Sequence, residues 1–419
     1  MTEQSRHVTV IGAGVVGMAT ALTLQRDGHS VTVIDRLGPG EATSFGNAGG
    51  MAVTEMQPVS LPSTIWKVPG WLTDPEGPLA IRPAYLPRLT PWLWRFWRAG
   101  RMARVTEVAD AQAALNDRAR ADWAPLLKAS GLEDQVKTNG ALTLYRTEKG
   151  YRADALSWKL RRERGVETHE IGGEEIGQLE PDIGPGFHRG VLLPDWGHVL
   201  DPKRIVTRLA ERFVADGGEI IRHEVTGIRR EGRLVTALET GDGPRPVDCL
   251  VVCAGVWSGR IAGWLGDKAA LESERGYHVT LPAAEVGLRR MLIMGEDQFV
   301  MTPMSMGLRL AGTVEMGGLG AEPNMARARV LLSKARRVLP ALEREGALEG
   351  KTEWSGHRPA TPDTIPVISA SPGAENVFHG FGHGHLGLTQ AAVTGRLLAD
   401  MIGGRESGIR LSDYRVDRF

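Results

Sequence analysis

The sequence predicts an α/β protein with two domains, and three observations predict it. The chain of 419 residues is longer than one compact core usually runs. A strand, a glycine-rich turn, a helix and a second strand follow one another between residues 7 and 35. An apolar strand at residues 248–253 resumes the same kind of parallel sheet after a long interval. We therefore expect a discontinuous first domain at residues 1–52, 200–270 and 355–419, and an α+β second domain with a mixed or antiparallel sheet at residues 53–199 and 271–354.

The N-terminal segment has the pattern of a Rossmann-type βαβ unit. His7–Ile11 is a β-branched run, and the residues from Val15 to Arg26 have helical apolar spacing. Val31–Ile34 then reads as a second strand, which ends at Asp35. The turn between the first strand and the helix has the sequence Gly-Ala-Gly-Val-Val-Gly. This context predicts a dinucleotide site, although the bare glycine pattern is weak in a chain with 53 glycines.

Each glycine of such a turn has a physical role. Gly12 permits the tight turn, Gly14 lets the backbone approach a pyrophosphate, and Gly17 lets helix and strand pack closely. The helix N-terminus presents free N–H groups to the phosphates, and Asp35 accepts the ribose hydroxyls. Arg36 either neutralises or stacks at the adenosine end or lies on the surface. The alternative is a purely structural glycine-rich turn.

A second glycine-rich junction lies near the C-terminus. Asn376–Phe381 looks like a strand, residues 382–387 repeat the glycine spacing, and Leu388–Met401 has helical apolar spacing. No third element with a closing acid follows, so this is not a second Rossmann unit. It aims a helix N-terminus at an electron-rich group, and a flavin fits because its reduced form carries negative charge. The alternative is a turn with two surface histidines.

Composition limits the classes of function. Fifty basic residues balance fifty acidic ones, so nucleic acid is not an expected partner. The two cysteines, Cys249 and Cys253, lie in one apolar segment, which excludes a disulfide scaffold and a thiolate metal cage and fits a reducing compartment. No metal site is expected. The uncharged run from Val8 to Gln25 contains Gly-Ala-Gly and leads into a second strand, so we interpret it as cytoplasmic structure rather than a secretory signal.

Five ordered motifs together resemble the D-amino-acid-oxidase-like flavoproteins, and within them the bacterial D-amino-acid dehydrogenase branch. These motifs are GAGVVGMATALTLQRDGHSVTVIDR, TSFGNAGG at residues 43–50, LVVCAGVWS at 250–258, GHRPATPDTIPVI at 356–368 and FGHGHLGLT at 381–389. The segments ERGYHVTL at 274–281 and TPMSMGLRLAGTVEMGGL at 302–319, with the Pro/Trp-rich stretch at 61–100, are similar to glyphosate oxidoreductase and the D-hydroxyproline dehydrogenases.

The resemblance implies FAD, held noncovalently because Phe45 follows Ser44 and neither cysteine is C-terminal. It implies oxidation of the C–N bond of a small D-amino acid, cyclic imino acid or N-substituted glycine, by hydride transfer from Cα to flavin N5 and hydrolysis of the imine. Electrons then pass to oxygen or a quinone. A nicotinamide-dependent dehydrogenase and a flavoprotein subunit without turnover are the alternatives. The oligomeric state stays open.

The resemblance also assigns candidate residues. Arg358 matches the arginine that pairs with the substrate carboxylate, with a structural ion pair to Asp363 as the alternative. His385 lies where relatives carry a basic residue near the flavin, and Tyr277 and His278 are weaker candidates. The residues expected to bind the cofactor are Gly12, Gly14, Val15, Val16, Gly17, Asp35, Arg36, Ser44, Asn47, Gly49, Gly50, Met51, Val225, Ala254, Gly255, Trp257, Gly382, His383, Gly384, Leu386, Gly387, Leu388 and Thr389.

Two further segments have open interpretations. Residues 53–104 hold eight prolines and five of the eleven tryptophans, interleaved at the end with arginines. This segment is either a peripheral contact with the inner face of a membrane or a proline-stiffened wall of the second domain. The residues from Arg327 to Leu342 predict an amphipathic helix whose many arginines form a solvated face.

Overall fold

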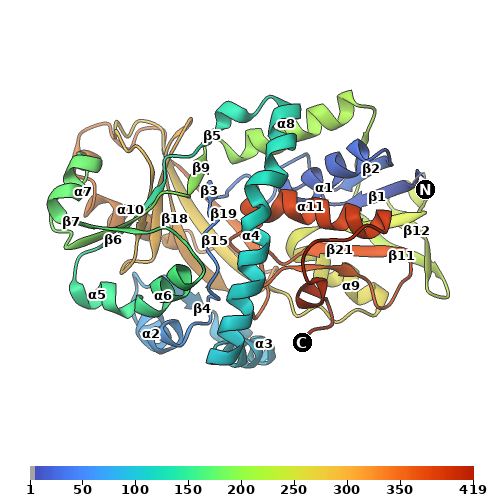
Figure 1. Ribbon diagram of the computed structural model, residues 1–419, viewed down its shortest axis with the longest axis horizontal. Helices are drawn as coiled ribbons and strands as arrows, with labels where there is room; N and C mark the ends of the chain where they lie inside the picture. Colours follow the sequence, from blue (N-terminus) through green and yellow to red (C-terminus); the bar gives the residue numbers. More distant parts are fainter. Residues whose placement is uncertain (1–4) are drawn as a thin grey trace.

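The predicted N-terminal unit is present in the computed structural model, which describes residues 5–419 (Figure 1). β1 (His7–Ile11) leads into α1 (Val15–Arg26) and then β2 (Ser30–Asp35). β1 is hydrogen bonded in parallel to β2 on one side and to β14 (Cys249–Val252) on the other. The apolar strand in the middle of the sequence is therefore the direct neighbour of the first strand.

A six-stranded sheet combines three distant segments of the chain. Its order is β10-β2-β1-β14-β21-β20, in which only β20 runs antiparallel to its neighbour. The added strands are β10 (Glu219–Arg222), β20 (Val367–Ala370) and β21 (Val377–Phe381). The carboxyl ends of β1 and β14 therefore meet at one edge of the sheet, where ligands of such folds bind.

Helices and a small sheet cover the two faces of this sheet. Alternate strand residues pack against one core that α1 shares with α4 (Met102–Ser130), α8 (Pro202–Ala215) and α11 (Gly387–Gly403). The other alternate residues pack against the antiparallel sheet of β11 (Val225–Glu231), β12 (Leu234–Thr240) and β13 (Gly243–Pro246), and against α9 (Ser258–Leu265). Both faces are buried, as expected of a parallel sheet.

A nine-stranded mixed sheet forms the other half of the molecule, on the left of Figure 1. Its order is β19-β15-β18-β17-β16-β6-β8-β7, with β4 paired to β18. Most neighbours are antiparallel, but β6 with β16 and β4 with β18 are parallel. The strands are β4 (Leu79–Ile81), β6 (Ala141–Tyr145), β7 (His169–Gly172), β8 (Arg189–Leu193), β15 (Glu272–Leu281), β16 (Met291–Met294), β17 (Phe299–Met304), β18 (Gly307–Met316) and β19 (Thr352–Ala360).

A three-stranded sheet and short helices complete the structure. The sheet joins β3 (Gly50–Met51), β9 (Gly197–Val199) and β5 (Val136–Lys137). The remaining helices are α2 (Pro62–Thr73), α3 (Leu86–Ala99), α5 (Glu148–Ala153), α6 (Ala155–Glu163), α7 (Gly173–Leu179) and α10 (Ala326–Arg336), with single 3-10 turns at Pro83–Tyr85, Glu133–Gln135, Gly255–Trp257, Pro340–Glu343 and Leu411–Tyr414. Within the described chain, no helix is both long and apolar enough to cross a bilayer.

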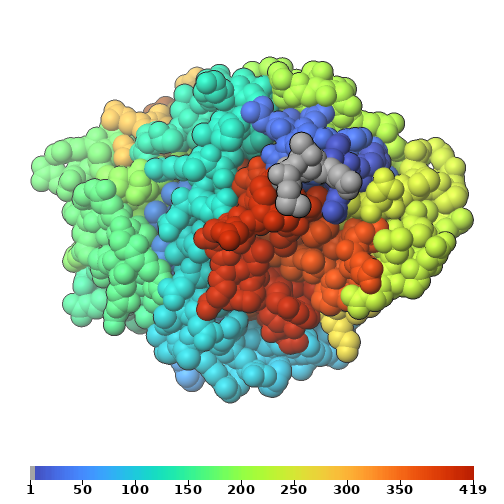
Figure 2. Space-filling model, turned by 45° about the vertical axis from the view of Figure 1, so that its right-hand side comes forward, coloured from blue at the N-terminus to red at the C-terminus, as the bar shows by residue number. Residues whose placement is uncertain are grey.

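The predicted fold class, an α/β nucleotide-binding domain beside an α+β domain with a mixed sheet, is confirmed. The predicted domain boundaries stay a prediction, and two contacts bear on them. α4 lies in the core of the six-stranded sheet rather than with the rest of residues 53–199. β19 pairs with β15 in the nine-stranded sheet, although residues 355–360 fall in the last predicted segment of the first domain. Figure 2 shows segments from the two chain ends side by side on one surface.

The predicted helix from Arg327 to Leu342 is shorter than expected. α10 ends at Arg336, and Leu339 has extended backbone because a residue before proline is disfavoured in the helical region. Its basic residues are also not all solvated. Arg327 is buried and donates a hydrogen bond to the carbonyl of Gly77 at 2.7 Å, which fixes the segment before β4.

Candidate functional site: a dinucleotide pocket beside a charged sheet face

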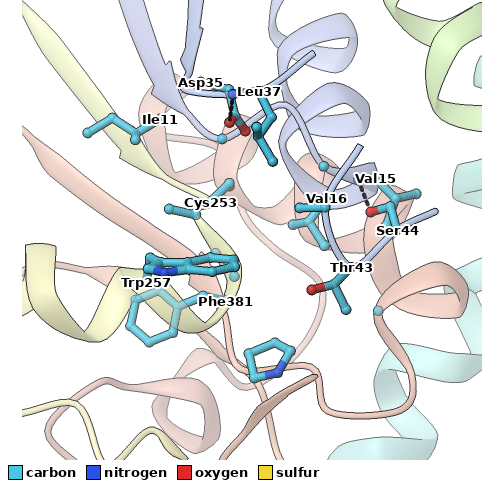
Figure 3. Close-up of a pocket in the computed structure, with 18 of the residues that line it drawn as sticks. Ile11, Val15, Val16, Asp35, Leu37, Thr43, Ser44, Cys253, Trp257 and Phe381 are labelled. Atoms are coloured by element: carbon cyan, nitrogen blue, oxygen red, sulfur yellow. Dashed lines mark hydrogen bonds between the residues drawn. The ribbon is translucent and has the colours of Figure 1, made fainter. Parts of the chain in front are cut away.

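A cavity of about 1150 Å³ lies at the carboxyl edge of the six-stranded sheet. Part of this space is open to solvent, and the cavity extends from the first strand of the sheet to the start of α11. Residues of both glycine-rich junctions line it. Figure 3 shows Val15, Val16 and Ser44 on one side of the cavity, with Trp257 and Phe381 on the other.

The first junction forms the part of the cavity that suits a pyrophosphate. Gly12 has a φ of 113°, and a Cβ there would lie 2.4 Å from the carbonyl oxygen of Cys253. Only glycine therefore allows the turn to pass this close to β14. Gly14 precedes α1, whose first turn carries no acidic residue, so the free helix N-terminus favours an anion. The hydroxyl of Ser44 accepts a hydrogen bond from the N–H of Val15 at 3.0 Å (Figure 3).

Asp35 and Arg36 mark the adenosine end of the cavity. The Asp35 carboxylate accepts hydrogen bonds from the N–H groups of Ala13 at 2.7 Å and Leu37 at 2.9 Å, and it lines the cavity. This fixes the carboxylate where a ribose would lie. The Arg36 guanidinium stacks over the Trp257 ring, 4.3 Å from its centre, and both residues line the cavity. Arg36 therefore lies in the pocket rather than on the open surface.

The second junction reaches the same cavity from the other side. His383, Gly384, Gly387 and Leu388 line it at the start of α11, whose first turn has no acidic residue. His383 is not a surface histidine. It is buried and hydrogen bonded to the Thr394 hydroxyl at 2.8 Å, and burial lowers its pKa to about 3, which keeps the ring neutral. The N-termini of α1 and α11 therefore both open onto one cavity.

The nine-stranded sheet holds the loop of residues 43–50, which carries Ser44 and Asn47 into the cavity. The Arg309 guanidinium donates to the carbonyls of Phe45 at 3.2 Å and Asn47 at 2.8 Å. His278 Nδ1 donates to the carbonyl of Gly46 at 3.1 Å. Burial and the nearby arginines lower the His278 pKa to about 3, so this histidine is a neutral clamp on the loop.

Tyr277 points to the opposite face of the sheet from His278. It is 1% exposed, it packs in the core beneath α10, and its hydroxyl is hydrogen bonded to the Glu315 carboxylate and accepts from the N–H of Asn324 at 3.0 Å. The side chain does not line the cavity. Its position indicates a structural role and gives no support to the expected contact with substrate.

Arg358 lies on the sheet face that carries His278. Its guanidinium lies over Gly276, where a Cβ would be 2.3 Å from Cζ. No hydrogen bond to this guanidinium is recorded within residues 5–419, and Nη1 is sealed from solvent. The alternative partner, Asp363, pairs instead with Arg418 at 2.9 Å and with Arg104 at 3.5 Å. Arg358 is therefore a partly buried cation whose described neighbours leave its hydrogen-bonding capacity unused.

His385 pairs with an acid that the sequence did not single out. His385 Nε2 donates to Glu274 Oε2 at 3.0 Å, and Glu274 is 8% exposed. Glu274 is the register partner of Arg358 across β15 and β19. Arg309 and Trp354, which stacks on His278 with ring centres 5.0 Å apart, were also missed. Strand pairing brings these residues together, so no local motif signals them.

Most of the predicted cofactor residues line the cavity, and a smaller group lies next to it. The lining residues are Gly12, Gly14, Val15, Val16, Asp35, Arg36, Ser44, Asn47, Val225, Ala254, Gly255, Trp257, His383, Gly384, Gly387 and Leu388. The predicted residues outside the lining are Gly17, Gly49, Gly50, Met51, Gly382, Leu386 and Thr389, together with Arg358, His385, Tyr277 and His278. Gly17 packs under the turn, where a Cβ would lie 1.8 Å from the carbonyl oxygen of Gly12. Among residues 5–419, no group of acids, histidines or cysteines is placed to hold a metal ion.

The fold and the site define a dinucleotide-binding protein of two domains, in which a charged sheet face adjoins the cofactor cavity. The chain belongs to the family described as FAD dependent oxidoreductase, whose profile matches residues 7–401. FAD fits the cavity because two helix N-termini without acids and an anchored ribose-binding acid open onto it. The prediction of an FAD-dependent enzyme is thus confirmed.

Known relatives and solved structures agree with this assignment. The chain is 37% identical over 419 residues to a D-amino-acid oxidase of Bradyrhizobium diazoefficiens, covering 99% of both chains. It is 31% identical over 420 residues to a D-amino acid dehydrogenase of Paramagnetospirillum magneticum, covering 98% of both. The fold is similar to that of glycine oxidase from Geobacillus kaustophilus, with a TM-score of 0.76 at 20% identity, covering 99% of this chain and 100% of the other.

Proposed function

We propose that this enzyme oxidises the C–N bond of a small amino acid, with a D-amino acid, a cyclic imino acid or an N-substituted glycine as substrate. The unpaired guanidinium of Arg358 carries this proposal. A guanidinium nitrogen that is sealed from solvent is unfavourable unless it donates a hydrogen bond, and a bidentate carboxylate is the partner that a guanidinium fits best. No hydrogen bond to Arg358 is recorded in the described chain, so a substrate carboxylate would satisfy it.

Bound FAD supplies a hydride acceptor at its N5 atom, next to which the substrate Cα must be held. The residues of the chain do the positioning. Arg309 and His278 clamp the loop of residues 43–50 to the sheet that carries Arg358, so the cofactor loop and the carboxylate site are fixed to one frame. The start of α11 places positive dipole at the cavity wall, where it stabilises negative charge on a reduced cofactor.

The names of the relatives favour an amino acid over other donors. Proteins named D-amino-acid oxidase and D-amino acid dehydrogenase share the full length of this chain at 37% and 31% identity. A nicotinamide-dependent dehydrogenase would not explain the glycine-rich junction at the start of α11. A flavoprotein without turnover would not explain the unused hydrogen-bonding capacity of Arg358. Both alternatives are therefore less well supported than amine oxidation.

Anaerobic mixing of the purified protein with a panel of D-amino acids, glycine derivatives and cyclic imino acids tests the proposal. We expect a yellow protein whose flavin absorbance bleaches with at least one member. Arg358→Ala should raise the KM of that substrate about 100-fold or more and leave FAD content unchanged, because a charged hydrogen-bonded pair is lost. A flavin that no member bleaches would contradict the proposed reaction, and an unchanged KM would remove Arg358 from the site.

For the electron acceptor, we propose a quinone reached by peripheral contact with an anionic membrane. Residues 77–106 contain six arginines and no acid. Trp94 and Trp97 on α3 are 54% and 51% exposed, with Arg98 and Arg101 stacked on them. Exposed rings beside guanidinium groups suit a lipid interface. Vesicles with anionic headgroups should co-sediment the protein, and Trp94→Ser with Trp97→Ser should abolish this. Equal co-sedimentation with neutral and anionic vesicles, or no co-sedimentation with anionic vesicles, would contradict it.

A further inference from the structure

Glu274 and Arg358 form an opposite-charge pair on one face of the sheet. They are register partners on β15 and β19, and side chains of directly paired residues project from the same face. The same face carries His278, which is hydrogen bonded to the loop of residues 43–50. The pair therefore faces the side of the sheet on which the cofactor loop lies.

The two charges do not satisfy each other. No ion pair within 4.0 Å joins them, although the charge of each group shifts the pKa of the other. The Arg358 guanidinium donates no hydrogen bond within residues 5–419, and Glu274 uses only Oε2, which accepts from His385 at 3.0 Å. Its Oε1 has no hydrogen bond and is not among the polar atoms sealed from solvent. One free carboxylate oxygen thus lies beside a free guanidinium.

Both groups keep their charges at neutral pH. Burial alone would raise the pKa of Glu274, but the hydrogen bond and charge of His385 and the charge of Arg358 bring it below its ordinary value. Burial lowers the pKa of Arg358 from its very high ordinary value, and Glu274 opposes this. An α-amino acid in neutral solution carries the complementary charges, a carboxylate and an ammonium joined through one carbon, and it can lie between two side chains that project from paired positions of neighbouring strands.

We propose that Glu274 is the second half of the substrate site and binds the cationic amine through Oε1 while Arg358 binds the carboxylate. This inference rests on the proposed function and deepens it, because it names the feature that selects the substrate. The site takes zwitterions, with either a primary or a secondary amine. It rejects carboxylates that lack the amine, since these would leave Glu274 unpaired beside a second anion.

Matched ligands separate the two charges. D-Proline and tetrahydrofuran-2-carboxylate differ only in the ring atom, which is an amine nitrogen in the first and an ether oxygen in the second. Sarcosine and methoxyacetate differ in the same way in an open chain. Both members of each pair keep the carboxylate. Binding is read anaerobically from the perturbation of flavin absorbance, so it does not require turnover. Glu274→Gln should weaken binding of the amine member at least 10-fold and leave the oxygen analogue within about 3-fold or improved. Arg358→Ala should weaken both members.

Controls make the result decisive. Glu349→Gln removes the same charge at an exposed position and should change neither ligand. Glu274→Asp keeps the charge but withdraws it by one methylene, so its affinity for the amine ligand should fall between those of the wild type and Glu274→Gln. If a low FAD content shows that Glu274→Gln misfolds, Glu274→Asp takes its place in the test. Equal weakening of both members, or no change in either, overturns the proposal. A wild-type flavin that binds these amines but is never bleached by any amino acid contradicts the proposed reaction instead.

Discussion

Gly276→Ala is expected to displace Arg358 without touching any ligand directly. A Cβ at this position would lie 2.3 Å from Arg358 Cζ and Nη2 and 2.4 Å from Nη1, whereas ordinary contact begins at 3.4 Å. The guanidinium must therefore move by about 1 Å. Gly276 is not among the glycines with positive φ, so alanine adds no backbone strain.

The displacement should act on the substrate and not on the cofactor. A misplacement of about 1 Å in a positioning group can cost about 100-fold in rate, and a carboxylate held bidentately is sensitive to it. We expect kcat/KM for the substrate that bleaches the flavin to fall about 10- to 100-fold, mainly through KM, with one FAD per chain retained. Steady-state kinetics and the absorbance of flavin released by heat measure both quantities.

Gly263→Ala is the matched control, because a Cβ on this residue of α9 has open space within 4 Å. It should leave both quantities at wild-type values. In a double-mutant cycle, Gly276→Ala should add little to Arg358→Ala, since the two changes remove one interaction. A wild-type KM in Gly276→Ala, or full additivity with Arg358→Ala, would refute the assignment of Arg358 to the substrate carboxylate.

Three further predictions concern stability, thiol chemistry and the cofactor. Asp267→Asn should cost about 1–3 kcal/mol of unfolding free energy at pH 7, because the buried Asp267 carboxylate is hydrogen bonded to His379 at 2.7 Å; a urea midpoint unchanged from wild type would contradict this. Burial raises the Asp267 pKa, but hydrogen bonds from His379 and Ser371 bring it below its ordinary value, so in acid the unfolded chain binds more protons than the folded chain. The stabilising effect of the carboxylate is therefore complete above about pH 5 and is lost as the pH falls through the lower folded pKa. Urea midpoints at pH 7 and pH 3.5 should show a smaller cost of the variant in acid. Burial raises the pKa of Cys249 to about 11 and of Cys253 to about 12. A chromogenic disulfide reagent at pH 8 should therefore modify neither thiol in the native protein and both in denaturant. Fast labelling of the native protein would contradict this and show that β14 opens. Asp35→Ala should raise the dissociation constant of FAD about 10- to 100-fold, measured by flavin fluorescence after reconstitution of the apoprotein, and full retention would remove Asp35 from the ribose site.

The nucleotide-binding unit could be predicted from sequence because its signals are local. β1 and α1 have the predicted bounds, and α11 begins at Gly387, one residue before the prediction. Strand periodicity, the glycine turn and helical spacing all lie within a short stretch of chain. The family and its cofactor followed from several such stretches in order, and the comparisons confirm both.

The charged sheet face could not be predicted because it depends on register between distant strands. Glu274 faces Arg358 only because β15 and β19 pair at those positions, and a shift by one residue would turn the side chain to the other face. The same alternation explains why adjacent Tyr277 and His278 have different surroundings, one in the core beneath α10 and the other against the cofactor loop. Residue type alone did not distinguish them.

We expect the N-termini of α1 and α11 to lie at opposite ends of one bound FAD. A crystal structure of the yellow protein tests it most directly. We expect a single FAD extended through the cavity, with its ribose at Asp35 and its ring system at Gly384 to Leu388. A ring system bound away from the start of α11, or a colourless protein that holds a nicotinamide dinucleotide in this cavity, would contradict it.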